Sequence, residues 1–76
     1  MTDIDNWVWV VDKDEMCCRS PENNVTVKME KEGEKIRGKL YDMPMELFGR
    51  IAEITNGERI IMQIVKTAEN EYFKFL

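Results

Sequence analysis

The feature that most constrains the fold of this chain is the alternation of apolar and polar residues between positions 24 and 41. The apolar positions are Val25, Val27, Met29, Ile36, Gly38 and Leu40. A period of two is typical of β-strands, because successive side chains point to opposite faces of a sheet. The segment between the two runs contains Gly33, which favours a tight turn. The sequence therefore predicts a β-hairpin over residues 24–41.

The charged residues near the turn suggest a register for this hairpin. If Glu32-Gly33 forms a two-residue turn, Lys31 lies opposite Glu34 and Glu30 lies opposite Lys35. Opposite charges on facing positions of two strands stabilise the pairing. The alternation, the turn glycine and these charge pairs all predict the same register.

Shorter elements are predicted before the hairpin. Residues 1–6 are polar, and we expect them to fray. Residues 7–11 are apolar on both faces of an extended chain, which is typical of a strand that is covered on both faces or meets a partner. Residues 12–15 predict a loop and residues 16–19 a short return strand. Residues 20–24 are turn formers.

A first helix is predicted to begin near Pro44, because proline suits the first turn of a helix. Asp42 is a candidate cap. The residues that form its predicted apolar stripe are Leu47, Phe48, Ile51 and Ile54. We expect Gly57 to end this helix in the left-handed conformation.

Residues 58–76 fit two secondary structures. As a helix, they place an apolar stripe from Ile60 to Tyr72 on one face. As a hairpin, they use the β-branched residues near Ile60 as one strand and residues 71–76 as the return strand. The helical pattern holds for longer, and residues 68–70 match a hairpin turn poorly, so the helix is favoured. The predicted fold class is α+β, a small antiparallel sheet formed by an N-terminal strand and the hairpin 24–41, packed on two C-terminal helices.

The length and the charge limit the organisation and the function. A chain of 76 residues predicts a single domain over residues 1–76. Its core is thin, so a homodimer would bury more apolar surface. The net charge is −4, and residues 1–34 contain nine acidic against four basic residues. This balance argues against broad binding to nucleic acid or to an anionic membrane. No apolar run approaches the length of a membrane span, and we expect a cytoplasmic protein.

The sequence carries no catalytic signature. It contains no histidine, its four glycines are isolated, and its only cysteines are the adjacent Cys17 and Cys18. Adjacent cysteines are poorly placed to bridge each other, and without histidine they have no partners for a tetrahedral metal site. We therefore expect no enzyme, no cofactor and no metal site. A thiol redox or metal-handling role for the cysteines is kept as a third alternative.

The favoured function is a small non-enzymatic protein-interaction or regulatory module. Its candidate interface consists of Trp7, Trp9, Phe73 and Phe75, because aromatic residues dominate the energetics of interfaces. In so small a domain the same side chains are also candidates for the core. The partner is an unknown protein or a second copy of the chain.

Residues 36–72 resemble the ribbon-helix-helix family of dimeric DNA-binding regulators. The matching residues are Ile36 to Tyr41 for the ribbon, Pro44, Leu47, Ile51 and Ile54 for the first helix, and Ile64, Val65, Ala68 and Tyr72 for the second. The resemblance implies that the ribbon pairs with its mate across a two-fold axis and enters the major groove of DNA. Arg37, Lys39 and Tyr41 would then contact bases or phosphates. This is the alternative function.

Overall fold

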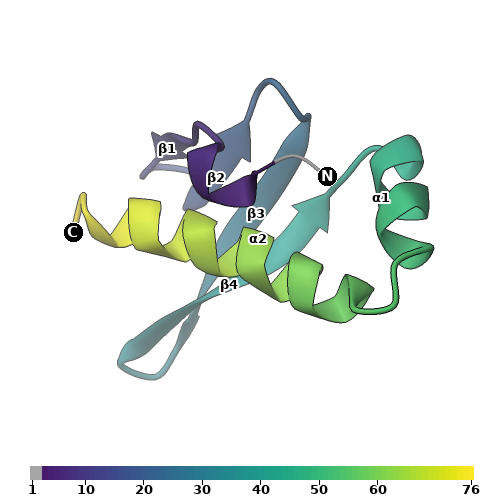
Figure 1. Cartoon of the computed structure of the whole chain (residues 1–76). Helices are drawn as coiled ribbons and strands as arrows, with labels where there is room; N and C mark the ends of the chain where they lie inside the picture. The colour runs from purple at the N-terminus through teal and green to yellow at the C-terminus, as the bar shows by residue number, and fades with distance from the viewer. Residues whose placement is uncertain (1–2) are drawn as a thin grey trace.

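The computed structural model describes residues 3–76, which form a four-stranded antiparallel sheet with helices on one side (Figure 1). The strands are β1 (Val10–Asp12), β2 (Cys17–Ser20), β3 (Val25–Glu32) and β4 (Lys35–Asp42), and they lie in the order β1-β2-β3-β4. A 3-10 turn, η1 (Ile4–Asn6), precedes them, and α1 (Met45–Ala52) and α2 (Gly57–Phe73) follow. The predicted α+β fold class is confirmed.

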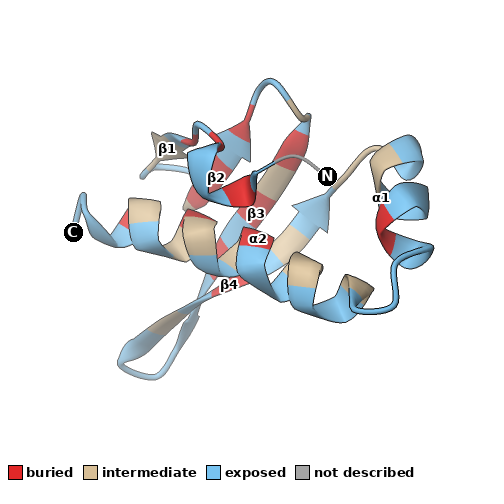
Figure 2. Cartoon of the chain, viewed as in Figure 1, coloured by how far each residue is buried: buried red, intermediate tan, exposed pale blue. Residues whose placement is uncertain are grey.

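The long helix α2 lies across one face of the sheet and forms the centre of the core. Ile64, Ala68 and Tyr72 are buried on its inner side, against Val27 of β3 and Cys18 of β2. Two further strand residues, Val25 and Met29, belong to the same cluster. Figure 2 shows the buried residues gathered between α2 and the strands. The helical interpretation of residues 58–76 is therefore confirmed, and the hairpin alternative is wrong.

The hairpin β3–β4 forms as predicted, but its turn lies one residue later. Gly33 and Glu34 are the two turn residues, and Glu30 pairs with Arg37 instead of Lys35. The reason is the backbone of Gly33, whose φ is +65°. The two-residue turns that suit hairpins need a positive φ at their first position, which glycine adopts without strain and Glu32 would not. Each β3 residue therefore pairs with a β4 residue two positions later than predicted. Because the shift is an even number of residues, each side chain still points to the predicted face of the sheet.

The N-terminal segment differs from the prediction in two respects. Ile4, within a region expected to fray, is buried, and the side chain of Asp3 accepts a hydrogen bond from the Asp5 N–H at the start of η1. The strand β1 begins only at Val10, and Val8 and Val10 are exposed. The segment is covered on one side only, because α2 packs on a single face of the sheet.

The connection between the helices also differs. α1 begins after Pro44 without a side-chain cap, so Asp42 is not the cap. Gly57 has no positive φ and forms the first residue of α2 after Asn56. Its role is steric, because a Cβ atom at Gly57 would lie 2.5 Å from the backbone oxygen of Ile51. Glycine is required here by the close approach of two backbones.

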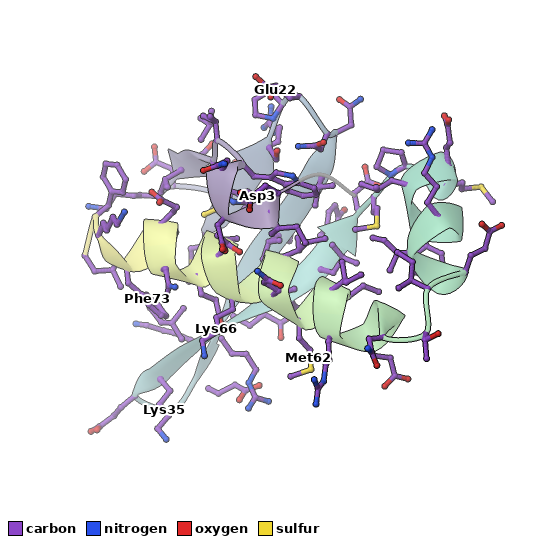
Figure 3. All side chains as sticks on the ribbon, viewed as in Figure 1. Asp3, Glu22, Lys35, Met62, Lys66 and Phe73 are labelled. Carbon is purple, nitrogen blue, oxygen red and sulfur yellow. The ribbon has the colours of Figure 1, made fainter. Side chains whose placement is uncertain are left out.

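Two parts of the fold extend away from the sheet and α2. The end of the hairpin β3–β4 projects beyond the helix, and Lys35 lies near its tip (Figures 1 and 3). α1 lies beside the first turns of α2 and packs on that helix (Figure 1). Of the predicted stripe on α1, Ile51 is buried and Leu47 is half-buried, whereas Phe48 and Ile54 are exposed. These two positions are corrections to the prediction.

Candidate functional site

The two predicted interface tryptophans lie inside the chain. Trp7 and Trp9 are each 8% exposed, and their ring centroids lie 5.9 Å apart. The indole Nε1 of each is buried, and neither donates a hydrogen bond within the described residues. Both rings belong to the core cluster that contains Ile4 and Ile64.

The two predicted interface phenylalanines lie on the surface. Phe73, the last residue of α2, and Phe75, just beyond it, are exposed, and Figure 3 shows Phe73 at this end of the helix. The alternative in which these two side chains belong to the core of the chain is therefore wrong. The structure therefore does not bring the four predicted aromatic residues together in one exposed patch.

A further outward-facing apolar surface lies on α1. At about 100° per residue, four of its eight residues fall within a sector of about 100°, and all four are exposed. They are Met45, Phe48, Gly49 and Ala52, and we call them the α1 stripe. Met45 is 90% exposed and Phe48 is 50% exposed. Leu47 and Ile51 lie on the opposite side of the helix, toward α2.

The apolar residues and Gly49 of α1 thus form one continuous arc of about 200°, of which only the part around Leu47 and Ile51 faces the chain. The polar side of α1 is narrow and includes Glu46 and Arg50, which form an ion pair of 2.8 Å. A surface helix of a globular protein normally has one apolar stripe that faces the core, and a helix that is apolar on most sides is normally buried. The α1 stripe therefore lies outside the part of the helix that the core covers.

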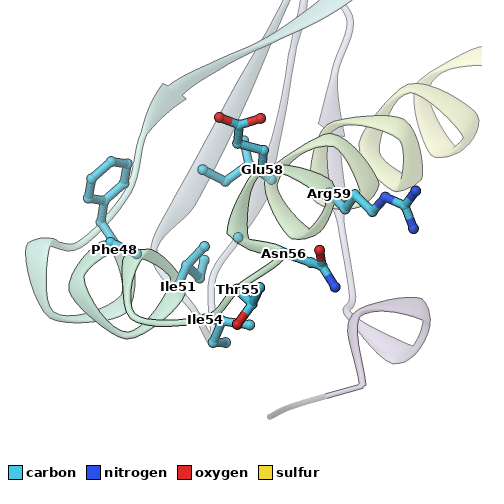
Figure 4. A pocket seen from close by; sticks show the side chains of 10 residues that line it. Phe48, Ile51, Ile54, Thr55, Asn56, Glu58 and Arg59 are labelled. Carbon is cyan, nitrogen blue, oxygen red and sulfur yellow. The ribbon is translucent and has the colours of Figure 1, made fainter.

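A groove of about 470 Å³ opens beside the stripe, where α1 leads into α2. Phe48, Ile51 and Ile54 line it from α1 and the connecting turn, and Ile61 and Glu58 line it from α2. Figure 4 shows Phe48 and Glu58 on either side of Ile51. The lining of the groove is therefore mixed, because Thr55, Asn56 and Arg59 join Glu58 beside these apolar side chains. We call the stripe and the groove together the α1 surface.

Gly49 distinguishes the α1 stripe from an ordinary exposed helix face. A Cβ atom on Gly38 would lie 2.7 Å from a side-chain carbon of α2, and one on Gly57 would meet the backbone of α1. Gly33 adopts a positive φ. Gly49, by contrast, has nothing within 4 Å of its ideal Cβ position. Glycine inside a helix costs about 0.5–1 kcal/mol relative to alanine, and the isolated chain shows no steric reason for it.

The predicted DNA-contact residues lie together on a second surface, the face of the sheet opposite α2. Arg37, Lys39 and Tyr41 are exposed on β4. Lys28 on β3 lies opposite Lys39, and its Nζ is 4.2 Å from the centre of the Tyr41 ring. Arg19 is exposed on β2. We call these five residues the basic sheet face.

Carboxylates partly neutralise the basic sheet face. Glu30 lies opposite Arg37, and the Arg37 guanidinium is 3.9 Å from a carboxylate oxygen of Glu32. This ion pair is exposed, so it contributes little to stability. It does reduce the positive charge that the face presents to a phosphate.

The outer edge of β4 is occupied at one position by the chain itself. The Gly38 N–H donates a hydrogen bond of 2.7 Å to Oε2 of Glu69 on α2. A free strand edge is a template for pairing with another strand, and a charged side chain that binds its amide group opposes such pairing. In the ribbon-helix-helix arrangement, this edge would pair with the mate.

The two cysteines point to opposite faces of the sheet. Cys18 lies in the core, where its Sγ is 3.4 Å from the carbonyl oxygen of Ala68. Desolvation by burial raises the pKa of Cys18 to about 11, with a further contribution from Cys17. Burial also raises the pKa of Cys17, and Asp12 adds to this effect. At neutral pH both thiols are therefore protonated, a form that is a weak nucleophile and a weak metal ligand.

Within residues 3–76, no group of three or more cysteine, aspartate or glutamate residues is placed to hold a metal ion. The helices of this same region are all too short or too polar to cross a membrane.

Sequence reasoning missed the α1 surface because it placed Phe48 in the core-facing stripe and assigned Met45 to no face. A signal was present for Met45, which lies about 160° from Leu47 and about 120° from Ile51 on a helical wheel. A search of protein-family models, of curated proteins and of solved structures finds no match to this chain.

Proposed function

We propose that this protein is a non-enzymatic protein-interaction module and that the α1 surface is its contact site. The observation that carries the proposal is the exposure of the α1 stripe on a helix that already packs the other part of its apolar arc on α2. The burial of a large apolar side chain contributes about 1.5–3 kcal/mol. Met45, which is 90% exposed, leaves most of this contribution unused within the chain, and Phe48, which is 50% exposed, leaves half of it unused.

The chemistry of the remaining groups supports a non-enzymatic role. The chain contains no histidine, and the raised pKa values keep both cysteine thiols protonated at neutral pH. General acid–base catalysis near pH 7 usually depends on groups that titrate near this pH. The thiol redox alternative accordingly gains no support from the environment of Cys17 or Cys18.

A comparison of matched surface variants tests this function. Met45→Ser combined with Phe48→Ser removes the apolar part of the α1 stripe, and Phe73→Ser combined with Phe75→Ser removes two exposed aromatic residues elsewhere. Phe48 and Phe75 are matched at 50% and 54% exposed, whereas Met45 is 90% and Phe73 42% exposed. Tagged wild-type and variant proteins are incubated with a lysate of the source cells, and bound proteins are quantified.

We expect one protein to bind the wild type and the C-terminal variant equally and to bind the α1 variant at least about tenfold less. Hot-spot residues at the centre of an interface produce effects of this size. Equal binding of this protein to both variants, or a loss confined to the C-terminal variant, would contradict the assignment of the contact site to α1.

A second candidate function is DNA binding through the basic sheet face, as in a ribbon-helix-helix-like regulator. The observation that favours it is the position of Arg37, Lys39 and Tyr41 on one exposed face, with Lys28 beside Tyr41. Such a regulator would use β4 as its ribbon. Pairing of two ribbons would require Glu69 to release the Gly38 N–H.

Charge reversal tests this candidate. Lys39→Glu on β4 is compared with Lys66→Glu, a matched change at an exposed position of α2. The anisotropy of a labelled DNA duplex is measured at about 25 mM and about 200 mM salt, because phosphate contacts weaken as the salt concentration rises. We expect Lys39→Glu to weaken binding more than Lys66→Glu. Failure of the wild type to bind at the lower salt concentration would eliminate this function.

A further inference from the structure

The α1 surface has two complementary parts at opposite ends of one short helix. Met45, its most exposed side chain, lies at the start of α1. The groove opens at the other end, where Ala52 and Ile54 line it. A projecting apolar side chain and a groove that is partly lined by apolar residues, both on the same surface, allow a self-complementary contact.

We infer that the partner of the α1 surface is a second copy of this chain, whose α1 packs antiparallel on the first and crosses it at Gly49. This inference rests on the proposed function and names the occupant of the same site. If two antiparallel helices cross at residue 49, residue 45 of each lies opposite residue 53 of the other. Met45 of each copy then lies beside the groove of the other copy, so both contacts form at once.

Gly49 is placed to serve as the crossing point. It lies near the middle of α1, among the residues of the exposed stripe, and the space beyond its ideal Cβ position is open. The distance between packed helices depends on the size of the side chains at their contact, so a glycine lets the axes approach closely. A second α1 packed at this point would explain why residue 49 is a glycine, since no steric contact within the chain requires glycine there.

The total surface area agrees with a missing partner. The chain exposes 5702 Å², whereas a monomer of 9.0 kDa is expected to expose about 4,850 Å². This excess of roughly 850 Å² is a total for the whole chain, to which the projecting hairpin and the C-terminal residues also contribute, and it compares with the roughly 800 Å² that each partner buries in a standard interface.

Of the two parts that extend from the body of the fold, α1 is the better place for this contact. The projecting end of the β3–β4 hairpin is mostly charged, as residues 30–35 show. Desolvation of these charges would oppose association. The α1 stripe consists of apolar residues, whose burial favours association.

A contact between copies that each carry a net charge of −4 should also tighten, or stay unchanged, as salt screens their repulsion.

Sedimentation equilibrium on the purified full chain tests the inference. We expect the apparent mass of the wild type to rise toward twice 9.0 kDa between about 1 µM and about 500 µM protein. Gly49→Leu places a large side chain at the crossing point, where the isolated chain has open space. We expect this variant to fold and to dissociate at a concentration at least about tenfold higher. Phe75→Ser, the matched control, should change the dissociation constant less than about twofold.

The possible outcomes separate the inference from the proposed function. A wild type that stays monomeric at about 500 µM overturns the second-copy inference. In that case the lysate comparison alone tests the proposed function. A protein other than this chain, captured from the lysate, would still need the α1 stripe for binding. A dimer that is unaffected by Gly49→Leu but is lost in Phe75→Ser also overturns the inference, since the contact would lie at the C-terminus. Circular dichroism confirms that each variant retains its fold.

Discussion

Replacement of Gly57 by alanine is the sharpest test of how the chain builds the α1 surface. The new Cβ atom would lie 2.5 Å from the backbone oxygen of Ile51 and 3.3 Å from its carbonyl carbon. A backbone oxygen cannot rotate away as a flexible side chain can, so the turn between α1 and α2 must shift. Because this turn lines the groove, the substitution should disturb both the stability and the site.

The expected magnitude follows from two opposing effects. Overpacking of a well-packed site typically costs about 1–3 kcal/mol, and the higher helix propensity of alanine recovers up to about 1 kcal/mol. We therefore expect Gly57→Ala to lower the free energy of unfolding by about 1–2 kcal/mol. Gly49→Ala is the matched control, because its Cβ atom meets nothing within 4 Å. It should raise the free energy of unfolding by about 0.5–1 kcal/mol.

Urea unfolding followed by tryptophan fluorescence measures both effects, because Trp7 and Trp9 are buried in the native state. For a small domain the free energy falls by roughly 1 kcal/mol per molar urea, so the two midpoints should move in opposite directions by roughly 1 M each. The protein concentration is kept low enough that the wild type is monomeric. If both glycine substitutions shift the midpoint in the same direction, the steric account of Gly57 is wrong.

Three further predictions concern the core, the strand edge and the buried thiol. Ile64→Ala should lower the free energy of unfolding by about 2–5 kcal/mol, because Ile64 is buried. Met62→Ala, at an exposed position, should change it by less than about 0.5 kcal/mol. Similar urea midpoints for the two variants would refute this prediction. Glu69→Ala should speed hydrogen exchange of the Gly38 amide selectively, and an unchanged rate would show that Glu69 does not protect this edge. The pKa of Cys18 is raised from 9.0 to about 11 on folding, so the associated stability is fully present below pH 9 and is lost as the pH rises toward 11 and beyond. The loss amounts to roughly 2–3 kcal/mol and should be missing in Cys18→Ser, so identical pH profiles of the two proteins between pH 8 and about 11.5 would contradict it.

The elements of this fold follow largely from local patterns in the sequence. The alternation at residues 25–40 predicted the hairpin, and the helical spacing from Ile60 to Tyr72 predicted α2, both of which form. These periods are properties of a strand and of a helix, so they are visible before any packing is known. The register required one further local fact, the positive φ of Gly33, which outweighed the predicted charge pairs.

The surface of the fold depends on contacts that local patterns do not contain. Val8 and Val10 are exposed because α2 covers only one face of the sheet, and Phe48 is exposed because α1 packs on α2 with its other side. The type of an apolar residue does not by itself tell whether its side chain lies in the core or on the surface. The pattern of the sequence thus determined which strands and helices form. Only the tertiary structure decided which apolar residues remain exposed, because exposure depends on which faces the packed elements cover.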